Sequence, residues 1–246
     1  MKNKIKDTLT EYKCLMRSVP GLVTACFFLA LICMNLLANK TIWTTEHTAA
    51  DGGILIGWAT FLAMDIITIR FGPRASTMVS ISAAVANAFI AILFKIAAII
   101  PTAEDFSAFN MIVGGTWFIT ISSITAQIVS AFANNFSNYA IGKLFKKDKN
   151  EGEGKLEYIC RSYISTFIGQ FVDNFVFGTL AFIVFAPYFW DGFHWTLPQS
   201  LFCAFMGAII ELISQIIFSP IGYKIVKKWE KEDVGKEYRE KYFLAK

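Results

Sequence analysis

Long apolar stretches alternate with short polar segments along this chain. A stretch of roughly 18 or more apolar residues predicts a membrane-spanning helix, because about 20 residues cover the hydrocarbon core at a rise of about 1.5 Å each. The pattern predicts six such helices, at residues 21–39, 54–71, 75–100, 113–145, 163–186 and 201–225. We therefore expect an all-α polytopic membrane protein with six transmembrane helices.

Two of these helices carry a local interruption or an excess of length. The helix at 113–145 is longer than a bilayer needs, so it either projects into water or breaks near Asn134. Pro220 is expected to kink or end the last helix, since proline removes a backbone hydrogen bond. Around the 19–226 transmembrane domain we expect a cytoplasmic N-terminal segment at 1–18 and a cytoplasmic charged tail at 227–246.

Composition and charge support a membrane location. The chain is 55% hydrophobic and 17% charged, and 21 of its 23 lysines and arginines fall in segments that six spans would place on one side. The exceptions are Lys40 and Lys95. The positive-inside rule puts both termini in the cytoplasm of a bacterial inner membrane. The net charge of +4 follows from this orientation, so we expect the lipid bilayer and no nucleic acid as partner.

The most informative polar residues lie inside the fifth apolar stretch. Gln170, Asp173 and Asn174 stand at i, i+3 and i+4, so a helix would present them on one face. Such a carboxylate and amide stripe is costly in hydrocarbon unless it meets a partner, water or a ligand. Three polar groups on one turn exceed what helix association requires, and the stripe predicts a binding site.

Other intramembrane polar residues extend this hypothesis. A weak internal repeat aligns Asn134 with Asp173 and Asn135 with Asn174, and Glu211 is a deep carboxylate in the sixth stretch. Lone amides in membrane helices more often serve as interhelical contacts than as ligands. Asp65 lies near a helix end, where a structural pairing with Arg70 or Arg74 competes with a gating role.

Amides and carboxylates of this kind suit a flat heterocycle with several N–H donors and carbonyl acceptors. Catalysis is not expected, because the two histidines, His47 and His194, lie in loops and the chain has no GxSxG or GxxxxGK[ST] motif. We expect a small-molecule substrate, no cofactor and no metal. Transport without an ATP site would need ion coupling, facilitated diffusion or an energising partner.

Four segments carry a family resemblance that covers nearly the whole chain, from about Gly21 to Lys231. They are NLLANK at 35–40, DIITIRFG at 65–72, RSYISTFIGQFVDNFVF at 161–177 and IIFSPIGYKIVKKWEK at 216–231. The chain resembles the VUT or YhhQ family of queuosine precursor and vitamin uptake transporters. The resemblance implies a six-helix fold related to the substrate-binding components of vitamin importers, and uptake of deazaguanine bases. It implies ligand-site positions at Asn39, Asp65, Gln170, Asp173 and Asn174.

One position departs from the family pattern. The glutamate usual four residues after the aspartate of the second helix is Ile69 here, which leaves the exact cargo and the coupling mechanism open. An alternative function is a substrate-binding membrane subunit that delivers a vitamin or base to a separate ATP-driven energising module. The sequence also leaves open whether the protein forms a homodimer.

Overall fold

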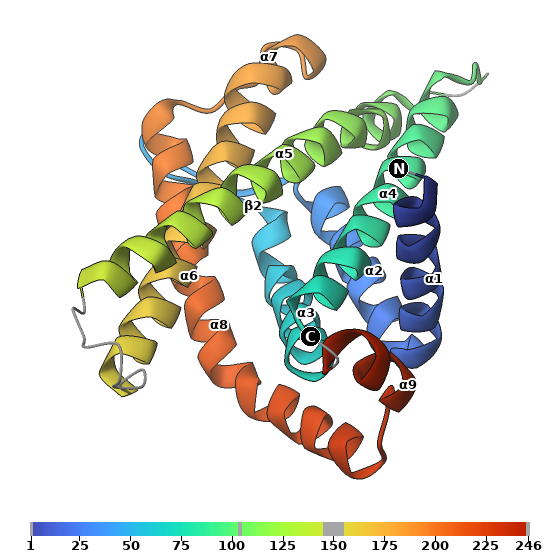
Figure 1. Cartoon of the computed structure of the whole chain (residues 1–246). Coiled ribbons are helices and arrows are strands. Elements are labelled where there is room, and N and C mark those ends of the chain that lie inside the picture. Colours follow the sequence, from blue (N-terminus) through green and yellow to red (C-terminus); the bar gives the residue numbers. More distant parts are fainter. Residues whose placement is uncertain (1, 103–104, 145–154, 245–246) are drawn as a thin grey trace. The chain divides into compact units, whose positions relative to one another are not determined.

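The computed structural model describes residues 2–102, 105–144 and 155–244 (Figure 1). The chain groups into two compact units. Unit 1 contains Met1–Met34, Leu55–Ile90 and Ser214–Lys246, and unit 2 contains Asn35–Ile54 and Ala91–Ile213. Helices dominate both units, as expected, and the described part of the chain is that of an all-α membrane protein with one small β-hairpin.

The described helices follow the apolar pattern closely. They are α1 (Lys2–Ser18), α2 (Gly21–Leu37), α3 (Gly57–Phe71), α4 (Pro73–Ile99), α5 (Ser107–Leu144), α6 (Lys155–Gly178), α7 (Ala186–Phe189), α8 (Leu197–Lys231) and α9 (Lys236–Tyr238). A 3-10 turn, η1 (Gly52–Leu55), precedes α3. The π-helical segments η2 (Thr179–Phe185) and η3 (Arg239–Phe243) follow α6 and α9.

Four of the described helical segments are long and apolar enough to cross a membrane, namely Pro73–Ile99, Ser107–Asn134, Tyr163–Phe189 and Leu197–Phe218. A fifth is obtained if α1 and α2, which bend by 103° at their junction, count as one span. The other expected spans correspond to short helices. At about 1.5 Å per residue, the 15 residues of α3 cover about 22 Å, less than the hydrocarbon core. The count of six spans therefore stays a prediction.

Both expected interruptions turn out to be continuous helix. Helix α5 runs through Asn134 without a break, so of the two alternatives the structure has the long helix. Helix α8 also continues past Pro220 to Lys231, because proline breaks only its own backbone hydrogen bond and packing can hold the flanking turns in line. The expectation that Pro220 ends the last helix is wrong.

The polar segment between the first two predicted spans forms an antiparallel β-hairpin from β1 (Thr41–Thr44) and β2 (Ala49–Asp51). The side chain of Gln199, at the start of α8, donates a hydrogen bond of 2.6 Å to the Thr45 carbonyl at the hairpin tip. Its Oε1 accepts a hydrogen bond of 2.7 Å from the Thr196 backbone N–H. The hairpin thereby holds the first turn of α8.

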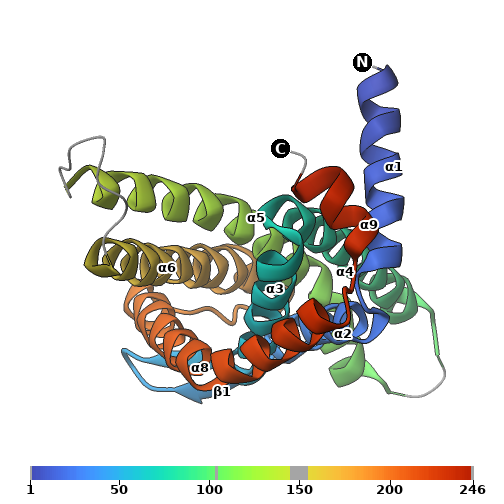
Figure 2. The same cartoon turned by 60° about the horizontal axis from the view of Figure 1, so that its bottom comes forward.

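In unit 2, α5 and α6 pack side by side over much of their length, which both views show (Figures 1 and 2). An aromatic and aliphatic core closes one end of this pair. It contains Phe118, Phe182, Trp190 and Trp195, and the rings of Phe182 and Trp195 stack with centroids 4.0 Å apart. This packing fixes α6 against α5 and so sets the position of the polar stripe on α6.

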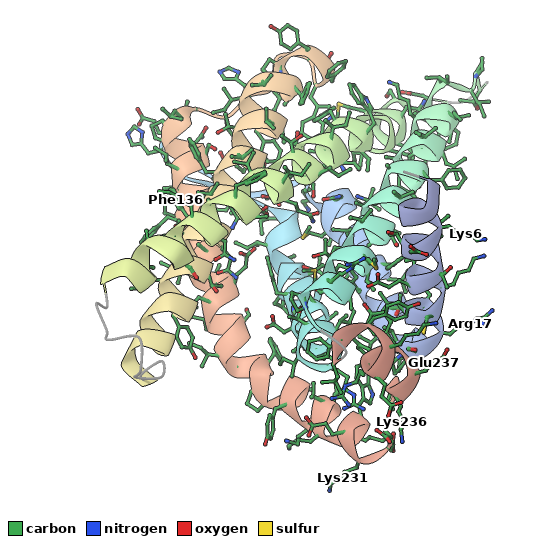
Figure 3. The ribbon with its side chains drawn as sticks, viewed as in Figure 1. Lys6, Arg17, Phe136, Lys231, Lys236 and Glu237 are labelled. Atoms are coloured by element: carbon green, nitrogen blue, oxygen red, sulfur yellow. The ribbon has the colours of Figure 1, made fainter. Side chains whose placement is uncertain are left out.

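In unit 1, α1 is amphipathic and turns one face to the core. Leu15 is fully buried and Glu11 is buried on that face, while Lys6 and Arg17 point away from the helix (Figure 3). The rest of this core comes from α2, α3, α4 and the C-terminal segment, with Phe71, Trp229 and Tyr238 in edge-on ring contact. The segment expected to be a solvated tail is in part core.

The C-terminal segment binds the turn between α3 and α4. Arg70, 3% exposed, donates from Nε and Nη2 to the Val234 carbonyl at 3.0 and 2.8 Å. The turn requires Gly72, whose φ is +90° and where a Cβ would lie 2.7 Å from the Phe243 ring. Pro73 then begins α4, a position that needs no backbone donor.

Glu11 connects α1 to both of these segments. Its Oε2 accepts 2.6 Å from Arg74 Nη2, and its Oε1 accepts 3.3 Å from the Tyr238 hydroxyl. Burial, with a contribution from Glu11, raises the pKa of Tyr238 to about 12, so the phenol stays a donor. We call Glu11, Arg70, Arg74, Val234 and Tyr238 the tail clasp.

The tail clasp predicts a stability difference between two acidic residues with equally short ion pairs. Glu11→Ala leaves Arg74 and the buried Tyr238 hydroxyl without their acceptor and is expected to lower the free energy of unfolding by about 1–3 kcal/mol. Glu230, paired with Lys227 at the same 2.6 Å but on the surface, is the control, and Glu230→Ala should change the free energy of unfolding far less, because solvent screens an exposed ion pair. Thermal unfolding of the purified variants in detergent measures both, and equal shifts would contradict the clasp.

Candidate functional site

The polar stripe of α6 faces α5 at a point of very close helix contact. A Cβ at Gly169 would lie 3.0 Å from Cβ of Asn134 on α5, so the glycine lets the two backbones approach there. Gln170 follows directly and is buried, with 5% of its surface exposed. The sequence-predicted residues Asn134 and Gln170 thus lie at one helix interface.

Asp173 on α6 accepts a hydrogen bond from α5. Ser130 Oγ donates a hydrogen bond of 2.8 Å to Asp173 Oδ1. No ion pair joins Asp173 to a lysine or arginine in the part of the chain that the structure describes. A single hydroxyl leaves most of the acceptor capacity of a carboxylate unused. Ser130 was missed by sequence reasoning, since serine is common in membrane helices and only its position four residues before Asn134 suggested a shared face.

Asn174 links the stripe to α8. A Cβ at Gly207 would lie 2.7 Å from Asn174 Nδ2, so the amide packs directly on the α8 backbone. The same Nδ2 donates a long hydrogen bond of 3.4 Å to Glu211 Oε2, one turn further along α8. The predicted residue Glu211 therefore joins the site through Asn174, and Gly207 is a second position that sequence reasoning did not identify.

Two buried amide oxygens at this interface have no hydrogen-bond donor among the described residues. They are Oε1 of Gln170 and Oδ1 of Asn134. An unsatisfied buried acceptor costs about 1–3 kcal/mol, so native structures usually supply a donor from protein, water or ligand. Together with Asp173, they make an intramembrane group of acceptors suited to a ligand with several N–H groups. We call Ser130, Asn134, Gln170, Asp173 and Asn174 the α5–α6 polar site.

Three further residues of the predicted site, Asn39, Asp65 and Asn135, are not assigned to the α5–α6 polar site. Asn39 caps the end of α2 and donates 3.1 Å to Thr116 Oγ1, and Thr116 lies about 21 Å along α5 from Ser130. Asp65 is half-buried on α3 in unit 1, whereas the α5–α6 polar site belongs to unit 2. The side chain of Asn135 lies outside the described residues. The structure does not bring Asn39 together with the stripe, because Thr116 and Ser130 are 14 residues apart on α5, and its role in ligand binding stays a prediction.

A further acidic residue, Asp51, is buried where β2 meets α8. Its Oδ1 accepts 2.7 Å from the Gly53 backbone N–H, and its Oδ2 accepts 3.7 Å from the Cys203 thiol. Burial is the largest influence on this carboxyl and raises its pKa to about 6. Sequence reasoning assigned Asp51 to a polar loop, and the hairpin that encloses it had no clear signal beyond the turn-forming pair Gly52 and Gly53.

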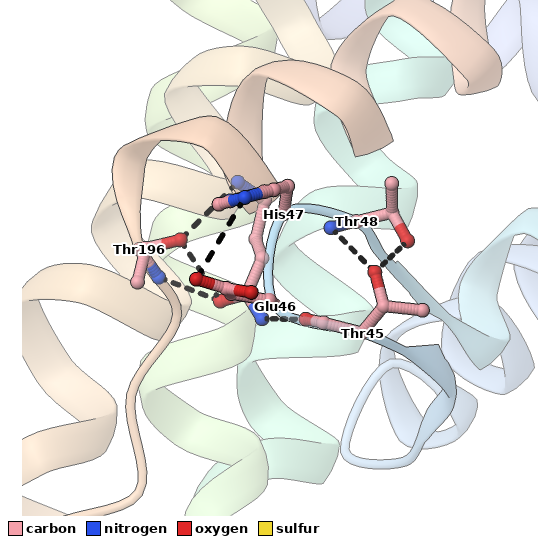
Figure 4. Close-up of polar contacts among 6 residues, drawn as sticks. Thr45, Glu46, His47, Thr48 and Thr196 are labelled. Atoms are coloured by element: carbon pink, nitrogen blue, oxygen red, sulfur yellow. Dashed lines mark hydrogen bonds and ion pairs between the residues drawn. The ribbon is translucent and has the colours of Figure 1, made fainter.

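The histidines show no catalytic arrangement. His47 and Glu46 are exposed on the hairpin and 3.8 Å apart (Figure 4), and His194 Nδ1 contacts the carbonyl of Gly192 at 2.9 Å. Neither histidine has a hydrogen bond or ion pair with a described residue of the α5–α6 polar site.

Asp51 predicts a pH dependence of stability. The fold binds this proton more tightly than the unfolded chain does, because the folded pKa is about 6 and the ordinary value is 3.8. The resulting stabilisation is complete below about pH 4 and is lost as the pH rises through 6, by up to roughly 3 kcal/mol. Thermal unfolding of wild type and Asp51→Asn across this range should show the loss in wild type alone. Glu46→Gln, on the exposed side of the hairpin, is the control and should follow wild type.

The structure thus defines an all-helical membrane protein with a buried polar site between its helices. The family model described as "Putative vitamin uptake transporter" matches residues 51–225, which is most of the chain. The chain belongs to this transporter family. No curated protein and no solved structure matches it. The match includes the whole α5–α6 polar site, Asp51 and Glu211.

Proposed function

We propose that this protein imports a purine-like base, of which a deazaguanine that serves as a queuosine precursor is the best candidate. The observation that supports this is the α5–α6 polar site, where buried acceptors of Asn134 and Gln170 lie on the same helix interface as the Asp173 carboxylate. Membership of a vitamin uptake family supports transport of a small molecule. The resemblance to queuosine precursor transporters supports the choice of base.

The chemistry of the site matches the edge of such a base. A carboxylate accepts two N–H bonds from a guanine-like edge, which suits Asp173. Gln170 and Asn134 offer further acceptors for ring N–H groups. Asn174, whose Nδ2 makes only a long bond to Glu211, can donate to a carbonyl of the base. Glu211 does not contact the base in this arrangement and affects its binding by holding the Asn174 amide.

The proposed setting is a bacterial inner membrane with both termini in the cytoplasm. In this arrangement α2 and α3 join the four longer helices as spans, giving six, and the excess of lysine and arginine lies inside. The hairpin of β1 and β2 then faces outward. The chain acts as a transporter and not as an enzyme.

A second candidate function is that of a substrate-binding subunit for a separate ATP-driven module. Only 22% of the α4 span is buried within the described structure, and its exposed face includes Ile81, Val85 and Phe89. Such a face can meet lipid, a second copy or another membrane protein. Co-purification of an ATPase with the intact protein would favour this function, whereas uptake by the purified protein alone in liposomes would exclude it.

The cargo is tested by growth of cells that lack their own precursor synthesis. Expression of the protein with an external deazaguanine base should restore queuosine in transfer RNA, measured by mass spectrometry of its nucleosides. Absence of queuosine, with the protein present in the membrane, would show that the cargo is another molecule.

The role of Asp173 is tested in the same cells. Asp173→Asn keeps the shape and one acceptor but removes the charge, and loss of a charge-assisted bond worth about 1.5–3 kcal/mol should weaken uptake about 10-fold to 100-fold. Asp105→Asn, which changes an exposed aspartate before α5, is the matched control. Unchanged uptake by Asp173→Asn at equal protein levels would remove Asp173 from the site.

A further inference from the structure

One face of α8 connects the outer hairpin with the α5–α6 polar site. Cys203, Gly207 and Glu211 stand at i, i+4 and i+8, so they share a face and span about 12 Å. Each of them meets a polar group from another element. Cys203 donates to Asp51, Gly207 receives the Asn174 amide, and Glu211 accepts from Asn174.

This face brings three carboxyl groups into electrostatic contact. Both Asp173 and Asp51 act on Glu211, and Cys203 lies close enough to interact with Asp51 and Glu211. In the described residues, no lysine, arginine or histidine forms an ion pair with any of the three. The described elements around Glu211 therefore supply amide, thiol and carboxyl groups and no positively charged partner.

Unpaired carboxylates at this depth are unfavourable, since charges in hydrocarbon cost several kcal/mol unless they are paired or neutralised. Repulsion of Glu211 by Asp173 and by Asp51 adds to this cost. With no cation bonded to them, the binding of a proton is the direct way to neutralise them. Carboxyl chains of this kind mark proton paths in membrane transporters in general.

We propose that Asp51, Glu211 and Asp173 form a proton line that couples import of the cargo to inward movement of one proton. A proton from the outside reaches Asp51, the last residue of β2, and water relays it along this face of α8, over about 12 Å, to the Glu211 carboxylate, which becomes a neutral acid. Cargo binds at Asp173 and Asn174 in this state. When the site opens to the cytoplasm, cargo leaves and Glu211 returns its proton to water there, so a neutral cargo carries one positive charge inward per cycle.

Asn174 is the residue that can couple the protonation of Glu211 to the binding of the cargo. Its amide touches Glu211 on one side and lies beside Asp173 on the other, so a change of charge at Glu211 changes the hydrogen bond that holds Asn174. The pKa of Asp51, raised by burial to about 6, supports its role as the outer proton acceptor. This inference rests on the proposed function, because it assigns the driving force of that same transport.

The test uses the purified full-length protein in liposomes with a radiolabelled 7-deazaguanine base. With the outside one pH unit more acidic, wild type should accumulate the base up to about tenfold, the ratio that one proton per cargo allows at this gradient. Glu211→Gln keeps the acceptor for Asn174. It should not accumulate the base along the pH gradient, whether or not it still exchanges labelled for unlabelled base at equal pH.

Asp51→Asn should slow gradient-driven uptake without changing exchange, while Glu46→Gln on the same hairpin should behave as wild type. Two results would overturn the proton line: accumulation by Glu211→Gln equal to that of wild type, or accumulation by wild type that follows a sodium gradient and ignores the pH gradient. In both cases exchange of the base would still support the proposed function.

A measurement without cargo separates the two proposals. If wild type shows no exchange of the base, the proposed cargo is wrong. Infrared difference spectra of the purified protein then still test the proton line. Wild type at mildly acidic pH should show the C=O stretch of a protonated buried carboxylic acid, and Glu211→Gln should lose part of that band. Identical spectra for wild type and Glu211→Gln would overturn the proton line whatever the cargo is.

Discussion

The high cost of unsatisfied polar groups in hydrocarbon governs this structure. Most of the membrane-embedded chain meets it by placing apolar side chains on helices whose backbone bonds are internal. The α5–α6 polar site is where this rule is locally broken, and each feature around it reduces the cost. Gly169 lets α5 and α6 approach closely, and Gly207 leaves room for the Asn174 amide on α8. Ser130 donates to Asp173, and Asn174 donates to Glu211. The acceptors left over on Gln170 and Asn134 are what a ligand can use.

Much of this was predictable from the sequence, and the reasons are specific. Apolar stretches of spanning length predicted α4 to within two residues and located α5, α6 and α8 with ends up to eight residues off, because in a membrane helix length and hydropathy follow from one physical requirement. The spacing of Gln170, Asp173 and Asn174 gave their common face, since helix periodicity alone decides it. The family resemblance of these segments was confirmed by the match to residues 51–225.

The remainder depends on contacts between distant segments, which spacing does not encode. Asn39 was grouped with the stripe although its partner Thr116 lies far along α5, because a family pattern lists positions and not distances. Asp51 was assigned to a loop since a three-residue strand leaves almost no signal. Pro220 was expected to kink or end a helix that continues past it to Lys231. Ile69, the departure from the family pattern, is 61% exposed on α3 within unit 1.

The tail clasp has a consequence for the order in which unit 1 can assemble. Val234 and Tyr238, which bond Arg70 and Glu11, follow them in the chain by 164 and 227 residues. Until those later residues have been synthesised, the buried Arg70 guanidinium and the Glu11 carboxylate lack these partners. The first two segments of unit 1 therefore cannot complete its core alone, and folding of this unit depends on closing one of the longest loops in the chain.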